Sequence, residues 1–423
     1  MINAEEKGTK AFLIGIRDEK ISIPEADSLK AEFSGLVYTL GLEIAAHELV
    51  HVREKSVKYG MGSGKAETLA QTAASLEADC IIFDRDLSPS QQRNWEELSG
   101  IPAIDRQELI IQIFASRART REAELQINLA ELIYSLPRLR HKYIDLSRQR
   151  GGRYGTRGSG ETRFETDRRL VEQRIHRLEE ELEDVKRQRQ VQRRLRERQG
   201  VPVCALVGYT NVGKSTILNA LTGADVLAED KLFATLDSTS RRLELPQGTK
   251  VLMVDTVGFI RRLPHSLIKA FRSTLEEASS ADLLINVLDA SSPDTDTQYK
   301  TTISVLREIG ADNIPMITVL NKVDLAEAHG EGSVEALLSR YRESLPLSAA
   351  SGKGIEELCA LIERSLSGGK KRFRFPPERT DLAALLHRSG QVISEKYGEN
   401  FIEMEAVLDD RISGRLKEYR IHE

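Results

Sequence analysis

The chain has 423 residues, and its 61 Lys and Arg nearly balance its 65 Asp and Glu, giving a formal net charge of −4. Hydrophobic residues make up 40% and charged residues 30%, a globular composition long enough for about three domains. Aromatic residues, at 5%, argue against a large stacking platform for single-stranded nucleic acid.

Membrane and secretory signals are not expected. The sequence has no apolar run of about 18 residues and no apolar leader segment. The cysteines (Cys80, Cys204 and Cys359) are far apart and form no metal-binding spacing. A reducing, cytoplasmic compartment is predicted, with a membrane-peripheral fraction left open.

Residues 1–105 alternate short apolar runs with helical patterns. Strands are predicted at 11–16, 42–52 and 80–83, with helices at 28–40 and 66–78. Such alternation is typical of a small parallel α/β domain.

Two short motifs in this region match enzyme signatures. The run 47–51 reads His-Glu-Leu-Val-His, which fits a zinc site on a helix but fits a strand equally well. The run 60–65, Gly-Met-Gly-Ser-Gly-Lys, resembles a phosphate loop, but Ala66 follows the lysine where Ser or Thr is needed. A tight turn is the favoured interpretation, and a second, ATP-driven RNA-remodelling activity remains an alternative.

Residues 106–199 are predicted to form an antiparallel helical hairpin. Apolar residues recur at coiled-coil spacing on both helices, and Pro137 with the basic stretch after it is expected to end the first run. The loop between the helices, residues 148–160, is rich in Gly and Arg. It is interpreted either as a solvated turn or as an RNA contact. The seam residues are Leu125, Leu129, Leu132, Leu136, Val171, Ile175, Leu178, Leu182 and Val185, and the candidate RNA-binding residues are Arg148, Arg150, Arg153 and Arg157.

A phosphate-binding loop opens the next predicted domain, residues 200–367. An apolar strand at 203–207 precedes the loop, and a helix is predicted over 216–221. Glycines in such a loop let successive backbone amides face phosphate oxygens. Lys214 is expected to reach the β- and γ-phosphates, and Ser215 to ligate Mg²⁺. The predicted nucleotide-binding residues here are Gly208, Tyr209, Thr210, Asn211, Val212, Gly213, Lys214, Ser215 and Thr216.

A second strand, 250–255, ends in a carboxylate. Asp255 is expected to hold Mg²⁺ through water, and Gly258 to offer its N–H to the γ-phosphate. The segment 231–242 is expected to close over the γ-phosphate and Mg²⁺ through a threonine, with Thr235 preferred and Thr239 second. Lys214, Thr235 and Gly258 are the predicted catalytic residues.

A third strand leads into a base-recognition motif. Asp324 can accept hydrogen bonds from both N1–H and N2–H of guanine, a donor pair that adenine lacks, so the motif selects GTP. The carboxyl ends of these parallel strands should meet at one crevice, which backbone amides near Ser348 complete. The predicted base-side residues are Asn321, Lys322, Asp324, Ser348, Ala349 and Ala350.

Residues 368–423 are predicted to form a small C-terminal domain after a basic linker at 367–372. A helix is expected over 381–397 and strands over 401–408 and 414–421. The predicted fold class is α/β: a P-loop GTPase domain with an N-terminal α/β domain, an antiparallel helical hairpin and a small α+β C-terminal domain.

Three motifs together resemble the HflX family of ribosome-associated GTPases, in the translation-factor-like class. They are Phe-Ala-Thr-Leu-Asp at 233–237, Asp-Thr-Val-Gly-Phe at 255–259 and Gly-Glu-Thr-Arg-Phe-Glu-Thr-Asp-Arg-Arg at 160–169. The resemblance spans nearly the whole chain. Ser159 is a departure, since the family usually has proline there.

The resemblance implies a monomeric, Mg²⁺-dependent GTPase that converts GTP and water to GDP and phosphate. It also implies binding to rRNA of the large ribosomal subunit, with the hairpin tip near the peptidyl-transferase region, and splitting or rescue of stalled ribosomes. Phe259 stands where Ras-like GTPases have a water-orienting glutamine, so slow intrinsic hydrolysis is expected. A GTPase module of a tRNA-modification system and a nucleotide-binding scaffold are the alternatives.

Overall fold

The computed structural model divides into two compact units. Unit 1 comprises residues 1–189, 229–237 and 257–274, and unit 2 comprises 190–228, 238–256 and 275–423. Two short segments of the predicted GTPase domain therefore belong to unit 1. The residues that the structure describes are 8–17, 21–52, 56–149, 159–223, 232–235, 239–262, 264, 267, 272–328, 333–341, 343–366, 370–398, 400–408 and 416–421.

The N-terminal part of unit 1 is a parallel sheet with interleaved helices, as predicted. The strand order is β2-β1-β3-β4. The first helix begins before the predicted position because Ser22 caps it, accepting the Glu25 N–H at 3.3 Å. The bounds are β1 Lys10–Arg17, α1 Ile23–Leu40, β2 Glu43–His51, α2 Ser63–Ser75, β3 Cys80–Phe83, α3 Pro89–Ser99, β4 Ala103–Ile104 and α4 Arg106–Arg117.

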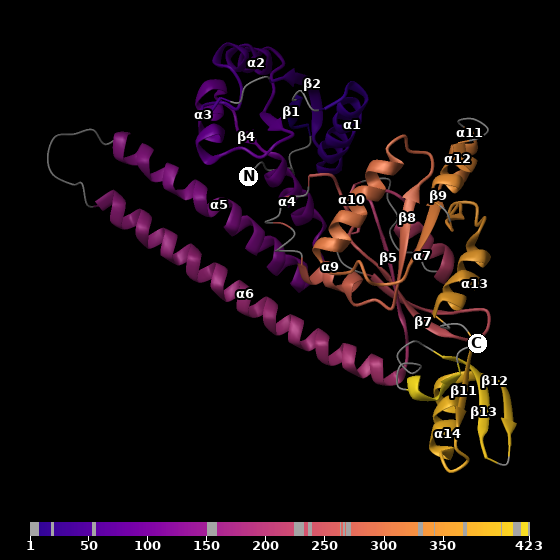
Figure 1. The fold of residues 1–423 in the computed structure, drawn as a ribbon. Helices are drawn as coiled ribbons and strands as arrows, with labels where there is room; N and C mark the ends of the chain where they lie inside the picture. The colour runs from indigo at the N-terminus through magenta and orange to yellow at the C-terminus, as the bar shows by residue number, and fades with distance from the viewer. Residues whose placement is uncertain are drawn as a thin grey trace. The chain divides into compact units, whose positions relative to one another are not determined.

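Two long helices, α5 (Arg121–Gln149) and α6 (Ser159–Gln199), run side by side (Figure 1). Leu125, Leu129 and Leu178 are buried where they meet, and five more apolar residues pack around them (Leu132, Ile133, Ile175, Leu182 and Val185). The predicted seam is therefore confirmed over its central part. Residues 150–158 lie outside the described residues, so the RNA-binding prediction for Arg150, Arg153 and Arg157 stays a prediction. Arg148 lies near the end of α5.

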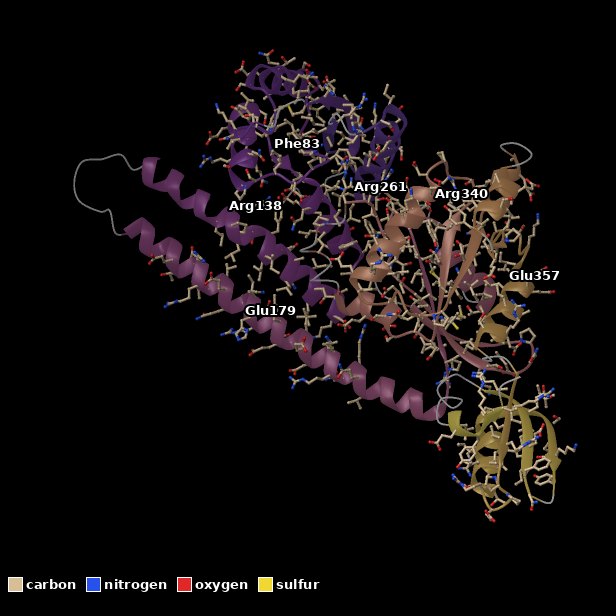
Figure 2. The ribbon with its side chains drawn as sticks, viewed as in Figure 1. Phe83, Arg138, Glu179, Arg261, Arg340 and Glu357 are labelled. Atoms are coloured by element: carbon tan, nitrogen blue, oxygen red, sulfur yellow. The ribbon has the colours of Figure 1, made fainter. Side chains whose placement is uncertain are left out.

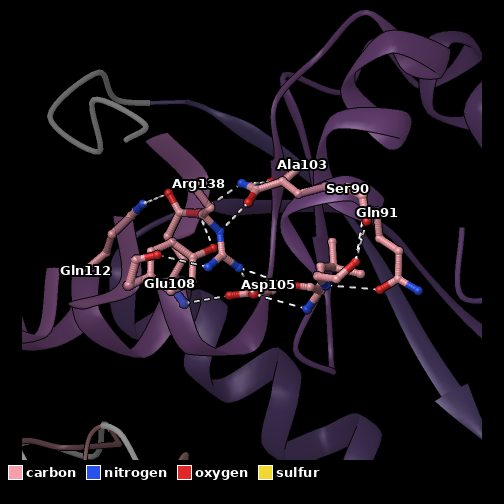
Figure 3. Close-up of polar contacts among 11 residues, drawn as sticks. Ser90, Gln91, Ala103, Asp105, Glu108, Gln112 and Arg138 are labelled. Atoms are coloured by element: carbon pink, nitrogen blue, oxygen red, sulfur yellow. Dashed lines mark hydrogen bonds and ion pairs between the residues drawn. The ribbon is translucent and has the colours of Figure 1, made fainter. Parts of the chain in front are cut away.

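The apolar run was predicted to end at Pro137, but the helix itself continues, since Pro137 lies inside α5. Its neighbour Arg138 anchors this turn to the α/β domain (Figure 3). The Arg138 guanidinium stacks on Tyr134 at 3.5 Å from the ring centroid and donates to Asp105 Oδ2 at 2.9 Å. It also donates to the Leu87 carbonyl at 2.9 Å. These contacts hold the chain helical across a residue that removes one helical hydrogen bond.

The GTPase part of unit 2 is a six-stranded sheet in the order β10-β9-β8-β5-β7-β6. All neighbours are parallel except β6, which pairs antiparallel to β7. The carboxyl ends of the parallel strands consequently share one edge. The bounds are β5 Val203–Gly208, α7 Lys214–Thr222, β6 Thr239–Glu244, β7 Lys250–Asp255, α9 Arg272–Ser279, β8 Leu283–Asp289, α10 Thr295–Glu308, β9 Met316–Asn321, α11 Val323–Ala328, α12 Ser333–Arg340, β10 Leu345–Pro346 and α13 Ile355–Leu366.

The C-terminal part of unit 2 is an antiparallel sheet, β12-β13-β11-β14, with one helix packed on it. Phe373, Leu386 and Met404 centre its core. The predicted helix over 381–397 is wrong beyond Ser389, because the chain pairs as strand β12 from Gly390. The predicted linker is wrong from Lys370, where β11 begins. The bounds are β11 Lys370–Phe375, α14 Thr380–Ser389, β12 Gly390–Tyr397, β13 Ile402–Leu408, η1 Lys417–Tyr419 and β14 Arg420–Ile421.

Candidate nucleotide-binding site

The phosphate loop follows a strand whose residues Cys204–Val207 are fully buried. Gly208 and Gly213 both have positive φ, 145° and 93°. A Cβ at Gly208 would lie 2.4 Å from the Val287 carbonyl oxygen, and one at Gly213 would lie 2.3 Å from Asn321 Nδ2. Because only glycine satisfies both the backbone angle and the space, the sequence specifies this loop at these positions.

Lys214 is buried directly beneath the loop. Its Nζ donates to the Tyr209 carbonyl at 2.8 Å, so the ammonium is folded back on the loop. Burial lowers the pKa of Lys214 to about 8, and the Asp255 carboxylate opposes that shift. The residue predicted to contact the phosphates is thus a buried lysine, and a bound polyanion would stabilise its charged form.

Ser215, in the first turn of α7, meets Asp255 at the end of β7. Ser215 Oγ donates to Asp255 Oδ2 at 2.5 Å, and Asp255 is fully buried. A hydroxyl and a carboxylate are oxygen ligands of the kind that Mg²⁺ prefers. The next residue, Thr256, donates its hydroxyl to the Leu206 carbonyl at 2.7 Å, which locks β7 against β5.

The base-recognition motif, at the end of β9, contacts the phosphate loop from two strands away in the sheet. Asn321 Nδ2 donates to the Val212 carbonyl at 2.8 Å, and Asn321 Oδ1 accepts the Ala349 N–H at 3.0 Å. Lys322 Nζ donates to the Asn211 carbonyl at 2.8 Å. These side chains therefore connect the two loops that sequence reasoning placed around the phosphates and the base.

Asp324 lies in the first turn of α11 and is exposed, as a carboxylate that receives a base from solvent must be. Ser348 is buried, and its N–H donates to the Lys353 carbonyl at 2.9 Å. Ala349 is half-buried and Ala350 exposed. Thr216, on α7, is half-buried. The structure thus gathers the predicted loop, Asp255 and base-side residues at one edge of the unit 2 sheet.

Two predicted phosphate contacts, Thr235 and Gly258, belong to unit 1. Thr235 is half-buried and Gly258 buried. The second choice, Thr239, begins β6 in unit 2 and pairs in register with Asp255. The roles of Thr235 and Gly258 stay predictions. Phe259 is 1% exposed, and the expectation of slow hydrolysis that rests on it stays a prediction.

The segment after Phe259 docks in unit 1 through Arg261 (Figure 2). Arg261 Nε donates to Glu32 Oε2 at 2.9 Å, and its Nη2 donates to Ser28 Oγ at 2.6 Å. The earlier segment docks as well, since the Phe233 ring meets Phe114 edge-on at a centroid distance of 4.7 Å. The two segments that carry Thr235 and Gly258, the predicted γ-phosphate contacts, therefore pack against helices α1 and α4 within unit 1.

Arg106 lies at the centre of an ion-pair cluster, and no sequence motif indicated its role. The other members of the cluster are Glu32, Asp84, Arg261 and Arg262. Arg106 Nη2 lies 2.6 Å from Glu32 Oε1 and donates to the Arg261 carbonyl at 3.0 Å, while its Nη1 pairs with Asp84. Arg262 lies 3.5 Å from the other Asp84 oxygen. Burial raises the pKa of Asp84, and the arginines oppose that shift. The paired residues of the cluster are 22 to 229 positions apart, so no local sequence pattern indicates it.

The structure places the two N-terminal motifs on a strand and at the start of a helix. His47 and His51 lie on strand β2, where four residues span about 13 Å, too far for one zinc ion. Within the part of the chain that is described, no cluster of three or more His, Cys, Asp or Glu could hold a metal. The 60–65 run contains the N-cap Gly62 and the first residues of helix α2, which begins at Ser63. The described helices include none long and apolar enough to cross a membrane.

A phosphate loop after one buried strand, a carboxylate ending the next and an Asn-Lys-Val-Asp motif ending a third define a P-loop GTPase. Comparison with known families agrees. Residues 203–322 match the family described as "50S ribosome-binding GTPase", 27–115 match "GTP-binding GTPase N-terminal", and 117–196 match "GTP-binding GTPase Middle Region".

The chain belongs to the HflX GTPase family. It is 45% identical to GTPase HflX of Akkermansia muciniphila, over 97% of this chain and 96% of that protein. It is 42% identical to GTPase HflX of Caldanaerobacter subterraneus, over 97% and 94% of the two chains. For GTPase HflX of Escherichia coli the identity is 41%, over 87% and 86%. The chain is therefore a GTPase, which hydrolyses GTP to GDP and phosphate, and the resemblance seen in the sequence is confirmed.

Proposed function

We propose that the unit 2 crevice binds GTP with Mg²⁺ and that nucleotide state controls association with the large ribosomal subunit. One observation carries the nucleotide assignment: Lys214, the Ser215–Asp255 pair and the Asn321–Lys322 clamp converge on the same loop. Each group has the chemistry needed at that place, a cation for phosphates, oxygen ligands for a metal and amide groups beside the base.

Lys214 supplies the charge for phosphoryl transfer. The Lys214 ammonium donates to the Tyr209 carbonyl, and a bound triphosphate would offer it charged phosphate oxygens as stronger partners. Loop amides after Gly208 and the amino end of α7 face the same phosphates. Charge that develops on the leaving β-phosphate is then stabilised by groups already in place.

Mg²⁺ fits the Ser215–Asp255 pair, because the first turn of α7 and the end of β7 bring two oxygen-bearing side chains together. When bound, the metal neutralises phosphate charge. The Ser215 hydroxyl would turn from Asp255 to the metal, and Asp255 would hold it through water. Thr235 is proposed as the third ligand in the GTP state.

Slow intrinsic hydrolysis follows from Phe259. Its buried ring has no group to orient the attacking water, so acceleration must come from another residue or a partner. Thr235 and the Gly258 N–H are proposed to bind the γ-phosphate and to be released after hydrolysis. Both segments make their contacts within unit 1, so their release would alter those contacts.

The proposed partner is rRNA of the large ribosomal subunit. The description of the family matched by residues 203–322 supports it, as does the basic, glycine-rich segment 148–160. We propose that a monomer acts in the cytoplasm, carries the hairpin tip toward the peptidyl-transferase region, and splits or rescues stalled ribosomes. The tRNA-modification and RNA-remodelling alternatives have no observation in their favour.

Titration of Lys214→Ala with a fluorescent GTP analogue tests the nucleotide site. Loss of the cation is expected to weaken binding by about 100-fold or more, because a buried charge-assisted contact disappears. The matched control is Lys353→Ala, an exposed lysine of the same unit that pairs with Glu327, and it should bind normally. Unchanged affinity of Lys214→Ala would remove the site from consideration.

Cosedimentation with purified large subunits tests the partner. More protein should pellet with a non-hydrolysable GTP analogue than with GDP. Replacement of Arg150, Arg153 and Arg157 by Gln should reduce pelleting at low salt. Equal pelleting in both nucleotide states would contradict nucleotide control, while leaving the GTP site itself intact.

A further inference from the structure

Asp289 ends strand β8, in register with Asn321 of the neighbouring strand, and lies outside the motifs described above. Its carboxylate is held from two sides. Oδ1 accepts the Ser291 N–H at 3.0 Å and the Ser291 hydroxyl at 2.6 Å. Oδ2 lies 2.7 Å from Lys322 Nζ, and the side chain is only 13% exposed. The position of this carboxylate is consequently fixed before any ligand arrives.

Lys322 links Asp289 to the phosphate loop. The same Nζ that pairs with Asp289 donates to the Asn211 carbonyl at 2.8 Å. A lysine ammonium on a flexible four-carbon stem has no preferred direction by itself, so a second anchor decides where it rests. The contacts from Asp289 to Lys322 and from Lys322 to Asn211 therefore connect the ends of β8 and β9 to the loop after β5.

The backbone around Asp289 is tied to the same neighbours. The Ala290 N–H donates to the Asn321 carbonyl at 2.8 Å, and Thr295 Oγ1 donates to the Asp289 carbonyl at 2.8 Å. Thr295 begins α10 and is buried. The carboxylate thus stands on a rigid support, as a group that sets the direction of another side chain requires.

We propose that Asp289 is a positioning residue for guanine-nucleotide binding, which holds Lys322 on the phosphate loop so that the base-recognition and phosphate loops keep their spacing. This inference rests on the proposed GTP site. A preorganised site loses less conformational freedom when it binds. GTP and GDP share the base, ribose and two phosphates, so Asp289 strengthens the binding of both by the same factor.

A double-mutant cycle tests the inference. Asp289→Asn and Lys322→Met, alone and together, are titrated with fluorescent GTP and GDP analogues. Each single change is expected to weaken GTP and GDP about equally, by roughly 3- to 10-fold. The double variant should bind no more weakly than Lys322→Met, because the carboxylate acts only through that lysine. In turnover assays the loss should appear in KM and much less in kcat.

Glu403→Gln is the matched control. It removes a carboxylate that lies 2.7 Å from Arg374 in the C-terminal sheet, the same separation as in the Asp289–Lys322 pair. Its nucleotide affinity should equal that of the unaltered chain. Far-UV circular dichroism of every variant establishes that the fold is intact.

Additive losses in the double variant, or full affinity in Asp289→Asn, would overturn the role of Asp289. If Asp289→Asn does not fold, Ser291→Ala replaces it, since that change removes one hydroxyl bond to the carboxylate. A loss of about twofold that vanishes in the Lys322→Met background supports the inference, and no loss overturns it. Normal binding by Lys214→Ala would instead refute the GTP site, so the two failures are distinguishable.

Discussion

The phosphate loop of unit 2 and the Arg106 cluster of unit 1 are both buried polar assemblies, but they are built from different groups. Side chains around the loop bond mainly to backbone carbonyls, such as those of Tyr209 and Val212. In the cluster, charged side chains bond mainly to one another. A backbone partner cannot be lost by mutation, whereas each charge in the cluster depends on its neighbours. The loop should therefore tolerate single changes structurally, and the cluster should not.

Arg106→Met gives the largest expected effect. It leaves the buried carboxylates of Asp84 and Glu32 short of a partner, and the free energy of unfolding of unit 1 should fall by roughly 3–5 kcal/mol. The chain has one tryptophan, Trp95, buried in unit 1, so urea unfolding followed by its fluorescence reports on this unit. GDP affinity should stay within twofold. A loss of less than about 1 kcal/mol in the free energy of unfolding would show that the cluster tolerates the removal of one charge.

Asp324→Asn tests the nucleotide site of unit 2, where nucleotide binding should decrease and folding should not change. The amide replaces one of the two acceptor oxygens with a donor, so one of guanine N1–H and N2–H faces an N–H, and GTP affinity should fall about 100-fold, or ~3 kcal/mol. The new amide can donate to the C2 carbonyl of xanthine, so XTP should bind better than GTP. Glu327→Gln, an exposed acid on the same helix, is the control. Retained preference for GTP would place base recognition elsewhere.

Raising the pH tests whether Lys214 is poised as its burial indicates. Burial lowers the pKa of Lys214 to about 8, and bound phosphates would stabilise the charged form. Binding therefore takes up a proton above that pH. GTP affinity should be full below about pH 8 and should decline as pH rises through it, approaching tenfold per unit, or ~1.4 kcal/mol. Titration calorimetry in two buffers measures the proton uptake. Zero uptake at about pH 8.5 would mean that Lys214 is already charged.

Arg121→Met gives the smallest expected effect and sharpens the contrast with Arg106. Its partner Glu181 is 3.2 Å away, and the two side chains are 81% and 48% exposed. Solvent screens such a pair, so unfolding followed by Trp95 should change by less than ~0.5 kcal/mol. A loss as large as that of Arg106→Met would show that exposure does not separate the two ion pairs.

Local patterns in the sequence determined the elements around the nucleotide. The phosphate loop could be placed because Gly208 and Gly213 adopt angles and spacings that other residues do not tolerate. Strands β3 and β7 were predicted at their observed bounds, since short apolar runs with abrupt polar ends leave little choice of boundary. The positions of Asp255 and Asn321 at strand ends followed from the same patterns.

Tertiary structure decided which side chains meet. Glu32 and Arg261 are 229 residues apart, and neither stands in a recognisable motif. Asp289 joins Lys322 only because β8 and β9 are neighbours in the sheet. Tertiary contacts also overrode local signals, as Arg138 keeps α5 helical past Pro137 and pairing with β13 turns residues 390–397 into a strand. Backbone geometry is encoded by neighbours in the chain, whereas partners of long charged side chains are set by the packing of distant elements.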